Sequence, residues 1–234
     1  MSSLDRAINS AVATGVAEII TLPICTIKTV YQNTDSKSIL QTVKHIYNTR
    51  GIPGFYKASV PAISSQIFSS SLKYVFYRKL EDENLPHTNK FINGALSGAM
   101  ASIFTHPIDV IKVHWQMGDT LPIHSPKIFY RGYSKTITKA TVSASLYFPL
   151  TDYFKTHTDN IAIASLCSAV ISIMVTHPID YLKTRHIYGL SLFEGWNPIT
   201  YYKGLSLNMA RILPHFVIMM TGIDLMEKYV THSR

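Results

Sequence analysis

Three copies of one short motif bring proline and charged residues into otherwise apolar helical segments. The copies are TLPICTIK at 21–28, THPIDVIK at 105–112 and THPIDYLK at 176–183. In the second and third copies an aspartate precedes the lysine by three positions, which places both side chains on one face of a helix. A lone charge in an apolar span is costly, so we expect these charges to point inward and to be paired. The motif therefore offers reversible ion pairing.

The partner of each charge lies either in the same helix or in a neighbouring one. A local pair at a helix end would explain a single copy of the motif. Repetition at matched positions favours a ring, in which the acid of one helix meets the lysine of the next and closes one end of a bundle. Pro23, Pro107 and Pro178 would bend three helices at that end. Because desolvation nearly offsets the attraction within such pairs, the ring can also open.

Long helices must hold these residues. The apolar pattern predicts six of them, at residues 7–33, 60–81, 90–117, 134–156, 160–187 and 206–230. Each is long enough to span a bilayer, yet each carries polar residues at intervals, which is typical of a bundle around a water-filled cavity. We therefore predict an all-α membrane protein with six transmembrane helices, although a soluble all-α protein remains an alternative.

The repetition divides the chain. An aromatic–basic–small triplet precedes each even-numbered helix, at 56–58, 130–132 and 202–204. The unit of helix, connection and helix thus occurs three times within one domain. The predicted repeats are residues 1–85, 86–157 and 158–234.

Composition and charge narrow the function. The chain of 234 residues is 47% apolar and only 15% charged, whereas soluble domains average about 25% charged residues. The net charge of +8 favours an anionic small molecule or anionic lipid as partner. The basic residues are scattered singly, so nucleic acid is not expected. No nucleophile constellation or phosphate-binding glycine loop indicates an enzyme or a cofactor. His106 and His177 lack further ligands at metal-binding spacing and are interpreted as helix-packing residues.

These motifs resemble those of the mitochondrial carrier family, whose odd helices carry P-x-[DE]-x-x-[KR] and whose even helices follow an aromatic–basic–glycine triplet. The resemblance covers essentially the whole chain. It implies three pseudo-symmetric two-helix repeats around a central cavity, which opens alternately to the two sides of the mitochondrial inner membrane. It also implies a monomeric exchanger in contact with membrane lipid, cardiolipin included.

The resemblance also implies which charges meet at the matrix side. By the family's cyclic pairing, Asp109 is expected to meet Lys183, and Asp180 to meet Lys28. From proline to the basic residue of the triplet, the spacing is 34 residues in the first repeat but 24 and 25 in the others. The surface helices of the second and third repeats are therefore expected to be shortened.

The first repeat departs from the family pattern. Cys25 occupies its acidic position, so Lys112 is expected to lack a carboxylate and to stay hydrated or meet the substrate. With two pairs instead of three, the matrix-side network should close less tightly. The family's bracing glutamine, nine residues after the proline, is matched by Gln32 and Gln116.

The cytosolic side is less regular. Family carriers close it with acid-x-x-base motifs on the even helices. The positions assigned to this gate are Arg78, Asp152, Lys155 and Asp224. Only the pair on the fourth helix keeps the family's pattern.

Family carriers bind substrate on the even helices near the middle of the cavity. The matching positions hold Ser65, Lys139 and Arg211, with Gln66 next to the first. An arginine and a lysine there require an anion. Because the even helices carry no acid at this level, we expect both cations to be available to substrate. Glu18, on the first helix, is the nearest competing acid and an alternative contact for a base or sugar.

Anionic nucleotides, deoxynucleotides included, fit the basic excess best, and Tyr147 is available to stack on a base. Inorganic phosphate and carboxylates are the alternative substrates. A carrier-fold membrane protein that binds a partner without transport is the remaining alternative.

Overall fold

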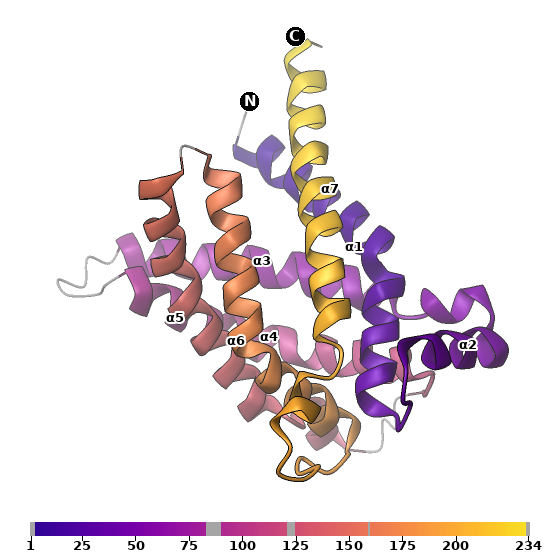
Figure 1. Ribbon diagram of the computed structural model, residues 1–234. Helices are drawn as coiled ribbons and strands as arrows, with labels where there is room; N and C mark the ends of the chain where they lie inside the picture. The colour runs from indigo at the N-terminus through magenta and orange to yellow at the C-terminus, as the bar shows by residue number, and fades with distance from the viewer. Residues whose placement is uncertain (1–2, 83–89, 121–124, 159, 233–234) are drawn as a thin grey trace.

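The computed structural model of the chain describes residues 3–82, 90–120, 125–158 and 160–232, and these residues form helices and connections only. Six long helices and one short surface helix are arranged as shown in Figure 1. They are α1 (Ser3–Asn33), α2 (Ile39–Arg50), α3 (Ser59–Asp82), α4 (Lys90–Met117), α5 (Tyr133–His157), α6 (Ile161–Tyr188) and α7 (Leu205–His232). Three short 3-10 helices precede α3, α5 and α7, namely η1 (Ile52–Phe55), η2 (Pro126–Tyr130) and η3 (Pro198–Tyr202).

The six predicted long helices are present, and their ends agree closely with the sequence prediction. The largest difference is at α1, which begins at Ser3 instead of residue 7. The surface helix α2 occurs in the first connection, where Ser38 caps it by accepting a hydrogen bond from the Gln41 backbone N–H. In the described parts of the other two connections only η2 and η3 are helical, as expected from their shorter spacing.

The long helices pack in chain order around a closed circuit. α1 packs against α3, α3 against α4, α4 against α5 and α5 against α6, and α7 completes the circuit by packing along α1. The helices α1, α4 and α6, which carry the internal prolines Pro23, Pro107 and Pro178, also contact one another. We call the region where the three proline motifs meet the motif end of the bundle.

The glycines of the aromatic–basic–glycine triplets are required by the turn into the next helix. Gly132 and Gly204 adopt positive φ angles of 80° and 85°, which side-chain-bearing residues rarely adopt. A Cβ atom at Gly204 would also lie 3.4 Å from side-chain carbons of Gln32 and Lys28 on α1. The triplet therefore allows α7 to begin directly against the charged segment of α1.

The repeated histidines fix the same turns. The His106 ring contacts the Arg131 carbonyl oxygen at 3.1 Å, and the His177 ring contacts the Lys203 carbonyl oxygen at 3.2 Å. Both rings are fully buried. They join α4 and α6 to the triplets that open α5 and α7, which confirms the prediction that they are helix-packing residues.

The distribution of polarity is the reverse of that in a soluble protein. On α1, Val16 and Ile20 are exposed by 44% and 54%, whereas Glu18 between them is fully buried. On α6, Met174 and Val175 are half exposed, while Asp180 is buried. Burial of charge beneath exposed apolar side chains contradicts a soluble core and fits a surface covered by lipid.

Two stretches in the described residues are long and apolar enough to cross a membrane by length and composition. They are Ala11–Asn33 in α1 and Ile163–Tyr188 in α6, each with a mean hydropathy of 1.5.

Candidate functional site

Two ion pairs join the proline-containing helices at the motif end. The Lys183 Nζ of α6 lies 2.7 Å from the Asp109 Oδ2 of α4, and Lys28 of α1 donates to Asp180 of α6. Both pairs connect different helices, so the charges of the second and third motifs do not form local pairs. These are the pairings expected from the cyclic arrangement.

Lys112 is not left without a carboxylate, contrary to the sequence prediction. Its Nζ donates to the Glu18 Oε1 of α1 at 3.0 Å. This third pair connects α4 to α1, so ion pairs link all three motif helices in a ring. The prediction failed because it considered only position 25 as the source of an acid on α1, whereas Glu18 lies seven residues earlier on that helix. The expectation of a ring with only two pairs is therefore wrong.

Arg211 is also paired with a protein acid. Its Nη2 lies 3.1 Å from the Glu18 Oε2, and its Nη1 lies 3.6 Å from the Cys25 Sγ. The His215 ring is 3.9 Å from the same carboxylate oxygen. The Glu18 side chain is only 1% exposed, and each of its oxygens holds one cation. The expectation that Arg211 is available to substrate is wrong for this structure, because the competing acid comes from an odd-numbered helix.

Lys139 is paired in the same way. Its ammonium donates to the Asp180 Oδ1, while Lys28 donates to the Oδ2 of that carboxylate. Asp180 is thus shared between a lysine of the ring and a lysine of α5. The Lys139 side chain remains 34% exposed, so Lys139 is more accessible than Lys28, which is 9% exposed.

The described interior carries an excess of positive charge. Its ion-pair clusters contain five cations and three carboxylates, namely Lys28, Lys112, Lys139, Lys183 and Arg211 with Glu18, Asp109 and Asp180. Two positive charges are therefore uncompensated when the histidines are neutral. Desolvated cations without matching acids favour the binding of an anion.

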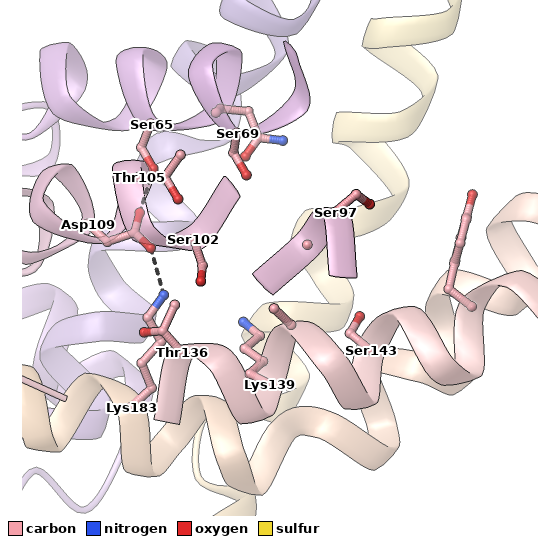
Figure 2. Close-up of a pocket in the computed structure, with 14 residues that line it drawn as sticks. Ser65, Ser69, Ser97, Ser102, Thr105, Asp109, Thr136, Lys139, Ser143 and Lys183 are labelled. Carbon is pink, nitrogen blue, oxygen red and sulfur yellow. Dashed lines mark hydrogen bonds and ion pairs between the residues drawn. The ribbon is translucent and has the colours of Figure 1, made fainter. Parts of the chain in front are cut away.

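A cavity of about 480 Å³ lies between α3, α4 and α5, with Lys183 of α6 at one side. Figure 2 shows hydroxyl groups from three helices around it, together with the Lys139 ammonium and the Asp109–Lys183 pair. The hydroxyl-bearing residues are Ser65, Ser69, Ser97, Ser102, Thr105, Thr136, Ser143 and Tyr147. Hydroxyls donate and accept hydrogen bonds, so this lining suits a ligand with many polar atoms.

The predicted substrate-binding residues are divided between two places. Ser65, Gln66 and Lys139 line the cavity, and Ser65 also donates to Asp109. Arg211 is not among the lining residues and belongs to the Glu18 cluster. Sequence reasoning missed most of the hydroxyls, although their spacing was a usable signal. On α5, for example, Thr136, Lys139, Ser143 and Tyr147 follow one another at intervals of three or four residues.

The two glutamines do not brace the ion pairs as expected. The Gln32 amide donates to the Lys203 carbonyl at 3.0 Å and accepts from Thr184, so it joins α1 to α6 and to the turn before α7. The Gln116 Nε2 is buried without a hydrogen-bond partner among the described residues. Gln32 therefore links helices through hydrogen bonds to groups outside the ion pairs, and the Gln116 amide nitrogen bonds to none of the described pairs.

The residues assigned to a cytosolic gate form no link between helices in the part of the chain that is described. Asp152 and Lys155 are 4.0 Å apart on the same helix, with side chains exposed by 62% and 44%. An exposed local pair of this kind contributes little to stability. The side chains of Arg78 and Asp224 lie outside the described part of the structure.

Both cysteines are free. Cys25 is buried beside Arg211, whereas Cys167 is only partly buried. No group of three or more potential metal ligands occurs among the described residues.

The comparisons with known proteins decide the family. The sequence profile described as "Mitochondrial carrier protein" matches residues 1–84 and 83–126, which is more than half of the chain. A mitochondrial carrier-like protein, L276, of Acanthamoeba polyphaga mimivirus is 54% identical over 94% of both chains. The chain belongs to the mitochondrial carrier family.

More distant carriers are similar over most of their length. The mitochondrial substrate carrier family protein W of Dictyostelium discoideum is 26% identical, over 94% of this chain and 84% of its own. The mitochondrial thiamine pyrophosphate carrier 1 of Ajellomyces capsulatus is 21% identical, over 79% of this chain and 72% of its own. Proteins of this carrier family are transporters of the mitochondrial inner membrane and not enzymes.

Proposed function

We propose that this carrier exchanges anionic nucleotides, deoxynucleotides included, across the mitochondrial inner membrane by alternating access. Its six long helices would cross the membrane as three two-helix repeats. The observation that supports this proposal most directly is the excess of two positive charges in the interior, next to a cavity lined with hydroxyl groups. A substrate with two or more negative charges would neutralise that excess.

The cavity fits the size and chemistry of such a substrate. Its volume of about 480 Å³ is within the range of roughly 300–1,000 Å³ that is typical of small-molecule sites. The hydroxyls of α3, α4 and α5 can bond to phosphate and sugar oxygens, while Tyr147 presents an aromatic ring to a base. Lys139 can reach a phosphate from the cavity wall because its side chain is partly exposed.

The ion pairs suggest how binding leads to opening. Asp180 and Glu18 each hold two cations. One belongs to the ring at the motif end, and the other lies on α5 for Asp180 and on α7 for Glu18. A phosphate that takes Lys139 or Arg211 removes one of the two cations from the acid. The bound phosphate also brings negative charge next to the carboxylate, so it repels the acid and competes with it for the ring lysine. The ring pair is thereby weakened, so the motif helices can separate. Binding energy is thereby used to open the ring.

Membership of the family supports the proposed location. A carrier of nucleotides in the mitochondrial inner membrane would supply or withdraw them between the matrix and the cytosol. The 54% identical relative comes from a mimivirus, which fits action in the mitochondria of a host cell. The relative named as a thiamine pyrophosphate carrier fits a phosphate-bearing substrate class.

Counter-exchange tests this proposal. Purified protein in liposomes preloaded with a nucleotide should take up labelled nucleotide, and inorganic phosphate or dicarboxylates should compete weakly. Exchange of phosphate or a dicarboxylate alone would assign the alternative substrate class.

A non-transporting carrier-fold protein is the second candidate, because every charge of the ring is already paired in this structure. A thermal-shift panel distinguishes the two, since a substrate raises the melting temperature of the protein that binds it. The absence of both exchange and stabilisation across nucleotides, phosphate and carboxylates would favour the non-transporting protein.

A further inference from the structure

We propose that Glu18 replaces the acid that is missing at position 25, so that it completes the ring of ion pairs and couples this ring to Arg211. The transport consequence rests on the function proposed above, whereas the pairing itself is tested independently below. Of the proline, acid and lysine that define the motif, the first copy lacks only the acid, and the ring is nevertheless closed.

The geometry of α1 allows this replacement. Glu18 precedes Cys25 by seven residues, which is close to two turns, so both side chains lie on the same face about 10 Å apart along the helix. The Lys112 Nζ lies 3.0 Å from the Glu18 Oε1, so the lysine finds its carboxylate on this face of α1 although position 25 carries no acid. Arg211 contacts both residues, with its Nη1 near the Cys25 sulfur and its Nη2 near the Glu18 carboxylate. Position 25 therefore faces the same cluster.

Burial indicates that the arrangement is more than a chance contact. The Glu18 side chain is 1% exposed, and the partner side chains of Lys112 and Arg211 are 16% and 21% exposed. A carboxylate in such a place is unfavourable unless it is fully paired. Glu18 satisfies this requirement with one cation on each oxygen.

This position gives Glu18 a coupling role between the ring and α7. One of its oxygens holds Lys112, which belongs to the ring, and the other holds Arg211, which belongs to α7. An anion that binds Arg211 must compete with Glu18. Glu18 is therefore a positioning residue, through which binding at α7 alters the link between α1 and α4.

The test moves the acid back along α1. Three variants are compared with the native chain by thermal unfolding in detergent, without substrate: Glu18→Gln, Glu18→Gln with Cys25→Asp, and Glu18→Gln with Cys25→Ser. We expect Glu18→Gln to lower the melting temperature by roughly 5–15 °C. The added Asp should recover most of this loss, whereas Ser, the matched neutral control, should not.

Two results would overturn the inference: a Glu18→Gln protein that melts like the native chain, or an Asp at position 25 that restores no more than Ser. Glu18→Gln and its Cys25→Ser derivative could fail to fold. In that case we expect folded protein only from the Cys25→Asp derivative, and failure of all three variants to fold would overturn the inference. Nucleotide exchange by the Asp derivative, at a rate above that of the Ser derivative, would support the coupling. Absence of exchange in the native chain would refute the proposed function and leave the melting result valid.

Discussion

Replacement of Asp180 by Asn would test how strongly the shared carboxylate holds the motif end. Asp180 is 7% exposed and accepts hydrogen bonds from both Lys28 and Lys139. Its neutralisation would leave two lysines, whose side chains are 9% and 34% exposed, with no carboxylate between them. Removing one partner of a buried pair costs about 3–5 kcal/mol. Since Lys139 is a third exposed and regains some hydration, we expect the lower end of that range, about 3 kcal/mol.

For a chain of this length, a loss of about 3 kcal/mol corresponds to a fall of roughly 6–12 °C in the melting temperature. Differential scanning fluorimetry of the detergent-solubilised protein measures it, and Asp152→Asn is the matched control. Asp152 also pairs with a lysine, but it is 62% exposed and its partner is on the same helix, so its loss should leave the melting temperature nearly unchanged.

The Asp180→Asn variant should also respond more strongly to ligand in the thermal-shift measurement. Asp180→Asn frees two ammonium groups, so a nucleotide should stabilise it by a larger thermal shift than it gives the native chain. Equal melting temperatures for Asp180→Asn and Asp152→Asn, or a smaller nucleotide shift in Asp180→Asn, would refute the reasoning.

Three further predictions concern the interior, a turn and the membrane. Lys139→Ala and Arg211→Ala should each slow nucleotide counter-exchange roughly 10- to 100-fold, because each removes a charged hydrogen-bond donor for phosphate, and rates within twofold of the native rate would argue against it. Gly204→Ala should lower the melting temperature by several degrees, because φ at this position is positive and the new Cβ would lie against Gln32. Gly195→Ala, with a similar φ but open space around Cβ, should lower the melting temperature less. A larger loss in Gly195→Ala than in Gly204→Ala would contradict this explanation. The protein should stay in the membrane pellet after alkaline carbonate extraction and enter solution only with detergent, because its apolar side chains face outward; release by carbonate would contradict a membrane protein.

Much of the fold was predictable because two kinds of local information agree. Apolar residues at helical spacing determined the long helices, and the triplets at 56–58, 130–132 and 202–204 placed the turns between them. The recurrence of the motif predicted a ring of charges between helices, and the specific pairs Asp109–Lys183 and Asp180–Lys28 were predicted from the resemblance to the carrier family.

What could not be predicted depends on distances between helices that no motif records. Glu18 lies outside the repeated motif, and nothing in its neighbourhood on the chain indicates that Lys112 and Arg211 both reach it. Lys139 was judged free because acids were sought only on the helices that follow the triplets, α3, α5 and α7, whereas Asp180 lies on α6. Which long side chains of neighbouring helices meet depends on how the helices pack in the bundle, and a single sequence does not give these distances.

The cavity illustrates the same limit. Each serine or threonine of its wall is unremarkable in isolation, because such residues also occur on helix surfaces in contact with neighbouring helices. Only the packing of α3, α4 and α5 shows that their polar faces converge.

Swapping the residues at positions 109 and 183 tests most directly whether paired charges on different helices close and open one end of the carrier. Nucleotide counter-exchange would be measured in liposomes for Asp109→Lys, for Lys183→Asp and for the two changes combined. The account predicts loss of exchange in each single variant, where like charges face each other, and recovery of a measurable part of the native rate in the combined variant. Single variants that exchange at the native rate, or a combined variant no better than the worse single one, would contradict it.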